Sequence, residues 1–320
     1  MVRHEARAHI LAAASVCLGL AAFTSSAGAQ TATQAIEMRF ELNDAQVKGR
    51  RLAGVSVRVS RLGGGEEVAS GETGFDGRFT ARLAPGTYEV RYRLDGYVPY
   101  TSEATELSAS GQLVTVSLSR MLEATEAAAR DVRIILNWGS RSDQVRDADS
   151  HLACACGASD RQVSYKSRRH ESAGHVVELD VDDTDWGGPE TITLTSPASG
   201  SYVYWVHDYS GPPAVLGASE LVVRVLIGSE QQGEFKVYRG LTQRAWRPFK
   251  AIEVRGDGAP ALVRFTEDEI AEGLDLAIPG ELRTPDPVQG PDAAVLVCPM
   301  AALFLALLIF AARRRKRRRG

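Results

Sequence analysis

Residues 36 to 120 contain short segments in which apolar and polar residues alternate, separated by turn residues every 8 to 12 positions. Residues 55 to 59 alternate valine with serine and arginine, and residues 86 to 94 alternate tyrosine, valine and leucine with charged residues. A period of two predicts strands that bury one face, and their regular spacing predicts a β-sandwich. The dipeptide Asp76-Gly77 predicts a hairpin turn.

Residues 131 to 266 form a second segment of short β-like runs separated by Gly, Pro and Ser, without a helical period. A second sandwich is therefore predicted there. Between the two segments, residues 121 to 130 are rich in Ala and Glu and predict a short helical linker. Residues 267 to 292 are first acidic and then Pro-rich, which is typical of a flexible stalk.

The two ends of the chain carry targeting signals. Residues 1 to 29 have a basic start, an apolar run and a small-residue site, which predicts a cleaved signal peptide. Residues 293 to 312 are uncharged and long enough to span a bilayer as a helix, and the tail 313 to 320 is almost entirely basic, which predicts a cytoplasmic end. Whether the helix is retained, cleaved or lipid-modified at Cys298 stays open.

The charge is unevenly distributed along the chain. The formal net charge is −3, from 37 basic and 40 acidic residues. Without the nine basic and one acidic residues of the signal peptide and the tail, 28 basic and 39 acidic residues remain, a net charge of about −11. This excess argues against nucleic acid as a partner and is compatible with cation binding. Cys154 and Cys156 predict either a local disulfide or two free thiols.

The first segment, about 45 to 120, resembles a known family through "LAGVSVRV", "TGFDGRFT", "LAPGTYEVRYRLDGY" and "LVTVSLS". These stretches, in this order, are similar to the carboxypeptidase regulatory-like, or transthyretin-like, domain. The resemblance implies a non-catalytic sandwich of seven strands that serves as a spacer or binding module on exported proteins. Some classifications group such domains with carbohydrate-binding-like folds.

The second segment, about 131 to 258, resembles the YfaP-like domain of bacterial envelope proteins. The resemblance rests on "ILNWGSRSDQVRDADSHL", "LDVDDTDWGGPETITL", "YVYWVHDYSG" and "AWRPFKAIEV". It implies an exported β-sandwich with no established activity.

The stretch "LDVDDTDWGGPE" suggests a cation site. If Leu179 and Val181 face the core, Asp180 and Asp182 stand on the open face, and Ca²⁺ takes six to eight oxygen ligands, often from two loops. A solvated acidic turn, or pairing with Arg168 and Arg169, is the alternative. The candidate Ca²⁺ ligands are Asp147, Asp149, Asp180, Asp182, Asp183, Asp185 and Glu190.

Tyr202 and Tyr204 lie in an aromatic strand and are candidates for stacking on a glycan, with cross-strand packing as the alternative. His207, next to Asp208, is expected to be paired structurally rather than to act as a base. No catalytic residue and no cofactor other than Ca²⁺ is predicted.

The sequence as a whole predicts an all-β protein with two tandem β-sandwich domains and one C-terminal transmembrane helix. We expect a non-enzymatic, membrane-anchored protein of the cell envelope, with a periplasmic or extracellular body that binds a glycan or a surface protein. A carbohydrate-binding surface protein is the alternative. An uncharacterised hydrolase is the third reading, which requires His207 or His151 to meet acidic residues in a deep pocket.

Overall fold

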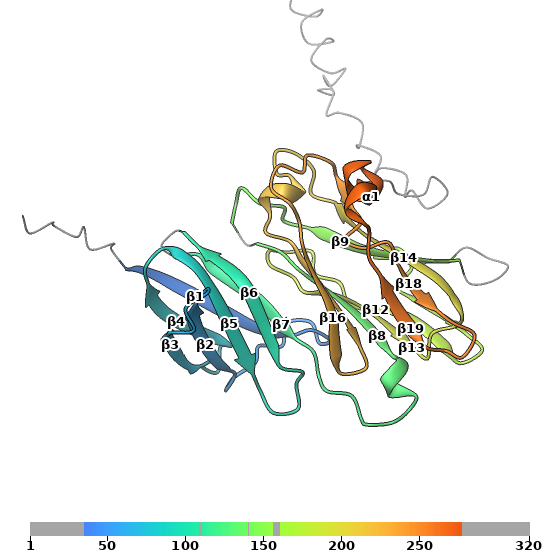
Figure 1. Ribbon diagram of the computed structural model, residues 1–320, viewed down its shortest axis with the longest axis horizontal. Helices are drawn as coiled ribbons and strands as arrows, with labels where there is room; N and C mark the ends of the chain where they lie inside the picture. Colours follow the sequence, from blue (N-terminus) through green and yellow to red (C-terminus); the bar gives the residue numbers. More distant parts are fainter. Residues whose placement is uncertain (1–34, 109–110, 140, 156–160, 277–320) are drawn as a thin grey trace, which may run out of the picture. The chain divides into compact units, whose positions relative to one another are not determined.

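The computed structural model describes residues 35–108, 111–139, 141–155 and 161–276 (Figure 1). The first seven strands form two sheets, one in the order β3-β2-β5-β6 and the other in the order β4-β1-β7. β1 pairs with β7 in parallel, and the other neighbours are antiparallel. The strands are β1 (Ile36–Asp44), β2 (Ser56–Arg61), β3 (Glu67–Glu72), β4 (Arg78–Leu83), β5 (Gly86–Arg93), β6 (Tyr100–Leu107) and β7 (Leu113–Leu118).

These two sheets bury one apolar core between them. Val57 and Val59 of β2 are fully buried and belong to the same cluster as Phe40 of β1 and Tyr92 of β5. The alternation along β2 and β5 therefore follows from burial of one face of each strand. The prediction of a first sandwich is confirmed.

The turn at Asp76-Gly77 differs from its prediction. Gly77 has a φ of +71°, and its N–H donates to the carbonyl oxygen of Gly74 at 2.9 Å. However, the strands on either side, β3 and β4, belong to different sheets. The hairpin prediction is wrong because an Asp-Gly dipeptide favours a local backbone conformation and does not determine which strands pair.

The remaining strands form the second sandwich. One sheet has the order β11-β12-β13-β8-β15-β16, and the other has the order β10-β9-β14-β18-β19, with β17 paired to β14. The strands are β8 (Val132–Asn137), β9 (Ala148–Ala155), β10 (Arg161–Val163), β11 (Arg169–Ser172), β12 (His175–Val181), β13 (Glu190–Thr195), β14 (Gly200–Asp208), β15 (Val222–Ile227), β16 (Glu230–Lys236), β17 (Ala245–Trp246), β18 (Ala251–Val254) and β19 (Pro260–Val263).

The core of the second sandwich takes residues from both sheets. Ile134 of β8 and Leu179 of β12 share one buried cluster with Leu152 of β9 and Tyr204 of β14. Along β12, every second residue from Val177 onward is buried. This pattern confirms the predicted core face of this strand, with Asp180 on the opposite side.

The ends of the second sandwich depart from the predicted boundaries. The predicted helical linker holds only the 3-10 turn η1 (Ala128–Arg130) among its described elements. The predicted stalk begins instead with α1 (Glu267–Ala271) and the 3-10 turn η3 (Leu274–Leu276). Thr266 and Glu269 form a capping box that starts α1, and Lys250 pairs with Glu269 at 2.6 Å. The folded part therefore continues past residue 266, because a capped turn and an ion pair hold this segment.

Several predictions fall on residues that the structure does not describe. These are the signal peptide 1–29, the span 293–312, the tail 313–320 and most of the stalk. Across the described ranges, no helix combines the length and apolar character that a membrane span requires. Cys154 is in a disulfide, so the alternative of two free thiols is wrong for this residue, whereas Cys156 lies outside the described residues.

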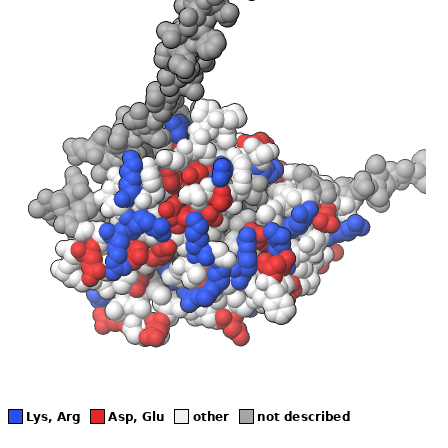
Figure 2. All heavy atoms as spheres, turned by 180° about the vertical axis from the view of Figure 1, so that it is seen from behind, with Lys and Arg blue, Asp and Glu red and all other residues white. Residues whose placement is uncertain are grey.

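Acidic and basic side chains are interspersed over the face seen in Figure 2 and do not form a broad patch of one sign. Some of the exposed acidic and basic side chains form ion pairs. Arg169 pairs with Glu178, and Arg146 pairs with Asp185 at 2.9 Å. Such exposed pairs add little stability on their own.

Candidate metal centre

One half of the candidate site lies on β9 and β14. In their antiparallel pairing, Asp149 is opposite His207 and His151 is opposite Trp205. Leu152 belongs to the core cluster, so by strand alternation Asp149 and His151 project from the opposite face. Asp149 is nevertheless only 3% exposed and His151 only 1% exposed. Two polar side chains on the outward face are therefore removed from water.

The other half lies at the hairpin of β12 and β13. Val181 pairs with Thr191, so the next positions outward are Asp182 and Glu190, at the two ends of the connecting loop. Gly188 in this loop has a φ of +73°. A Cβ on Gly188 would lie 2.7 Å from a ring carbon of Trp138. The loop therefore requires glycine at this position, both for its conformation and for its close approach to Trp138.

The two halves meet in a group of three carboxylates. One oxygen each from Asp149, Asp182 and Glu190 lies within 4.8 Å of the others. The backbone N–H of Ser150 donates to Oε2 of Glu190 and so joins the two sheets. Within the described part of the chain, Oε1 of Glu190, Oδ2 of Asp149 and Oδ1 of Asp182 are buried without a hydrogen-bond partner. Buried polar atoms normally have a partner, so these oxygens need an explanation.

The carboxylates perturb one another in the metal-free protein. Burial, followed by the charges of Asp147 and Asp182, raises the pKa of Asp149 to about 8. Burial and then the charge of Asp149 raise the pKa of Glu190 well above its usual range. Burial and the charge of Asp182 raise the pKa of Asp147 to about 6. Without a cation, this group therefore holds protons at neutral pH.

Four of the seven predicted ligands lie together. Asp149, Asp182 and Glu190 form the group itself. Asp147 lies close enough for its carboxylate to perturb Asp149, and its Oδ1 is another buried oxygen without a partner among the described residues.

The other three predicted ligands are directed elsewhere. Asp180 accepts a hydrogen bond from the Thr193 hydroxyl, and Asp185 pairs with Arg146 at 2.9 Å. Asp183 accepts from the backbone N–H of Asp185 at 3.3 Å. Consecutive acidic residues cannot all point to one centre, because each takes the partner nearest to its own position in the loop.

The predicted glycan platform is wrong. Tyr202 is 1% exposed and Tyr204 is fully buried. Tyr204 stacks on Phe249 with ring centroids 5.6 Å apart, and its hydroxyl lies 2.9 Å from the Ser150 hydroxyl. Both tyrosines are on the core face of β14, which satisfies the cross-strand packing alternative and leaves no face for a sugar.

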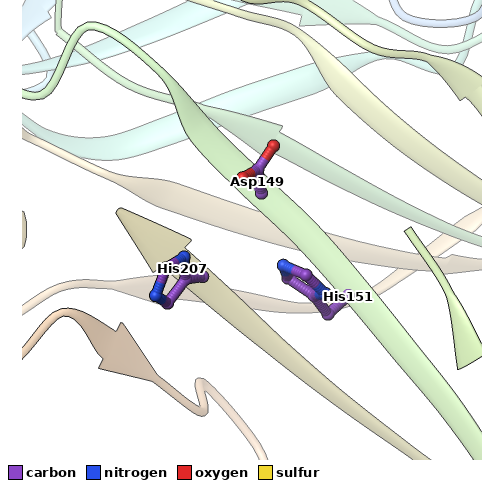
Figure 3. A group of neighbouring side chains, drawn as sticks. All are labelled: Asp149, His151 and His207. Atoms are coloured by element: carbon purple, nitrogen blue, oxygen red, sulfur yellow. The ribbon is translucent and has the colours of Figure 1, made fainter. Parts of the chain in front are cut away.

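Sequence reasoning did not bring His151 and His207 together. One ring nitrogen each of His151 and His207 lies within 4.8 Å of the other and of an Asp149 oxygen, and the three side chains face a shared space (Figure 3). The signal in the sequence was the spacing of two residues between Asp149 and His151 and between Trp205 and His207, because residues two apart in a strand share one face. The hydrolase reading required such a meeting of His151 or His207 with acidic residues; His151 is 1% exposed and His207 is half-buried.

Comparison with known proteins gives a family for part of the chain. The profile of the carboxypeptidase regulatory-like domain matches residues 43–119, which supports the first of the two resemblances. The comparisons do not show the second, YfaP-like resemblance. No curated protein matches the sequence.

Solved structures share only low similarity with this chain. The Bacillus anthracis TIE protein is 14% identical with a TM-score of 0.25, over 65% of this chain and 33% of its own. A candidate carbohydrate-binding protein of Bacteroides uniformis is 10% identical with a TM-score of 0.22, over 68% and 98%. The major pilin subunit BcpA of Bacillus cereus is 11% identical with a TM-score of 0.24, over 73% and 96%.

The chain spans about a third of the length of the Bacillus anthracis protein. These similarities carry no conclusion about function. What the comparisons show is that residues 43–119 match the model of the carboxypeptidase regulatory-like domain.

Proposed function

We propose that this chain is a non-enzymatic binding or structural protein of the cell envelope whose second sandwich is stabilised by a divalent cation, Ca²⁺. The observation that carries the proposal is the group of Asp149, Asp182 and Glu190, with buried oxygens that lack a partner among the described residues. The uncharged stretch 293–312 and its basic tail support a membrane anchor, and the leader 1–29 supports export.

The chemistry of the group suits Ca²⁺. Three carboxylate oxygens no more than 4.8 Å apart surround a centre that is at most about 2.8 Å from each, and Ca–O bonds are roughly 2.3–2.6 Å long. Ca²⁺ also accepts a flexible arrangement of oxygen ligands, whereas Mg²⁺ requires near-octahedral geometry. Asp147 supplies a fourth carboxylate at the edge of the group.

A cation bound by these carboxylates would connect the two sheets of the second sandwich. Asp149 belongs to one sheet, while Asp182 and Glu190 belong to the hairpin of the other sheet. Asp149 and Glu190 are buried, while Asp182 is partly exposed and its Oδ2 lies 3.5 Å from the Arg168 guanidinium. The three carboxylates repel one another, and a dication converts that repulsion into attraction. The ion would therefore fasten the β12–β13 loop to β9 and make the shape of this end of the domain depend on Ca²⁺.

The alternative is a group that stays protonated and binds no ion. Thermal unfolding of the full chain with Ca²⁺ and with chelator separates the two. A ligand at 100 times its dissociation constant adds about 2.7 kcal/mol to the free energy of unfolding. We expect Asp182→Asn to abolish the increase, while Asp185→Asn, in the same loop but paired with Arg146, retains it. No increase at millimolar Ca²⁺ would overturn the proposal.

A further inference from the structure

The outward face of β9 and β14 carries a ligand set of a different chemical kind. Asp149, His151 and His207 come from two directly paired strands, and the register of the pairing places the three residues next to one another. One ligand atom of each lies within 4.8 Å of the other two. Unlike the carboxylate group, this set offers two imidazole nitrogens and one carboxylate oxygen.

The position of the His151 ring is fixed on three sides. It stacks on Trp205 at a centroid distance of 5.1 Å and an interplanar angle of 8°. Tyr165 meets it edge-on at 6.3 Å, and the Gln162 amide lies 2.8 Å from Nδ1. A ring held in this way cannot turn to find another partner, so its orientation is set before any ion arrives.

The remaining nitrogen of His151 points into the shared space. Nε2 is buried and has no hydrogen-bond partner among the described residues, and Figure 3 shows a ring nitrogen of His151 directed between Asp149 and His207. A metal-binding histidine usually donates its other N–H to an oxygen. If the Gln162 amide group turns by half a turn, its oxygen rather than its nitrogen faces Nδ1. Nδ1 then carries the proton and donates it to this oxygen, and Nε2 keeps a lone pair that can bind a metal.

We propose that Asp149, His151 and His207 form a second metal site, which binds a divalent transition-metal ion, Zn²⁺ in particular. Imidazole suits Zn²⁺, whereas Ca²⁺ prefers oxygen ligands. Ligand atoms at most 4.8 Å apart lie no more than about 2.8 Å from a common centre, so each has to move by less than about 1 Å to reach a Zn–N distance of roughly 2.0–2.1 Å. Three protein ligands leave a fourth position for water.

Asp149 belongs to both ligand groups. With two oxygens it is able to bridge a Zn²⁺ ion on the histidine side and a Ca²⁺ ion on the side of Asp182 and Glu190. The second site does not require the first, because His151 and His207 are not part of the carboxylate group. Substitutions in the unshared ligands therefore separate the two sites.

The test is Zn²⁺ binding to the full chain, measured by titration calorimetry after treatment with chelator. We expect one Zn²⁺ ion per chain, and His207→Gln should weaken its binding more than about tenfold. His170→Gln, the same change on strand β11, is the matched control and should bind as the unmodified chain does. Asp182→Asn should retain Zn²⁺ while losing the Ca²⁺ effect, so the failure of either site is seen separately.

A second measurement needs no variant. X-ray absorption of the Zn²⁺-loaded chain should show nitrogen ligands typical of two imidazoles. Zinc bound only by oxygen would place the ion among the carboxylates, and zinc–sulfur distances near ~2.3 Å would place it on cysteine. Either result, or equal affinity in the chain with His207→Gln, would overturn the proposal.

Discussion

His207 of β14 lies directly opposite Asp149 of β9, in the pairing that also sets Trp205 against His151. This register places an imidazole and a carboxylate side by side on the face that points away from the core. Asp149 also meets Asp182 and Glu190 of the other sheet. Asp149 is common to both ligand groups, so its substitution is expected to affect both sites.

The metal-free chain is expected to lose stability as the pH rises. The folded-state pKa of Asp149 is about 8, whereas an unfolded aspartate has a pKa of about 3.9. A group with a raised folded pKa stabilises the folded state fully below the unfolded pKa, and this contribution is lost as the pH rises through the folded pKa. In chelator, the urea midpoint should therefore fall between about pH 5 and about pH 8.

Asp149→Asn should flatten this fall, because an asparagine side chain does not titrate. Asp185→Asn, on a side chain of the neighbouring loop that is 68% exposed, is the control for the removal of one carboxylate. An identical slope in the chain with Asp149→Asn would mean that another group controls the pH dependence.

Glu190 should show two separable roles. Its Oε2 accepts from the backbone N–H of Ser150, and leaving a buried donor unsatisfied costs about 1–3 kcal/mol. In chelator, Glu190→Ala should lower the free energy of unfolding by about this amount, whereas Glu190→Gln keeps an acceptor oxygen and should lower it less. Both variants should lose the stabilisation by Ca²⁺. Denaturant titrations with and without Ca²⁺ give all four values, and a Ca²⁺ effect retained in both variants would exclude Glu190 as a ligand.

Gly188→Ala should destabilise the loop more than an ordinary glycine substitution does. The alanine would have to adopt a positive φ, and its Cβ would lie 2.7 Å from the Trp138 ring. The matched control is Gly174→Ala, at a φ of +81° with no atom within 4 Å, which carries only the conformational cost of about 1–2 kcal/mol. We expect Gly188→Ala to exceed it by about 1 kcal/mol or more, measured by denaturant unfolding. Equal costs would mean that the loop moves away from Trp138 without penalty.

Tyr204 should behave as a core residue. Tyr204→Ala removes a fully buried ring and should cost about 3–5 kcal/mol, while Tyr204→Phe loses only the contact with the Ser150 hydroxyl and should cost about 1 kcal/mol. Thermal unfolding measures both. A stability that Tyr204→Ala leaves unchanged would contradict the packing that places this side chain against Phe249.

Much of the fold could be predicted from local patterns. The period of two along residues 55–59 and 175–181 identified strands and their core faces. Successive side chains of a strand point to opposite faces, so burial of one face requires an apolar residue at every second position. The same reasoning named all three residues of the carboxylate group, and Asp147 at its edge, as candidate ligands. It could not separate Asp182 from Asp180, because a register shift between Leu179 and Val181 leaves Asp180 beside Thr193.

Local patterns also failed where the phase of a strand mattered. Tyr202 and Tyr204 were assigned to one face correctly, but the alternation does not say which face of β14 meets the core. Packing against Phe249 and Leu152 decided that. When each strand was considered alone, the two buried tyrosines were proposed as binding residues, and His207 on the other face of the same strand was not.

The sequence by itself determined that the chain is β-rich, which residues of several strands face the core, and which segments carry acidic side chains. Only the tertiary structure decided that Asp149 meets Glu190 from the facing sheet and His207 from the neighbouring strand. The physical reason is that strand formation depends on neighbours two residues apart, whereas strand pairing and sheet packing join residues about 40 to 60 positions apart. A metal centre built from such contacts exists only once the sheets have assembled.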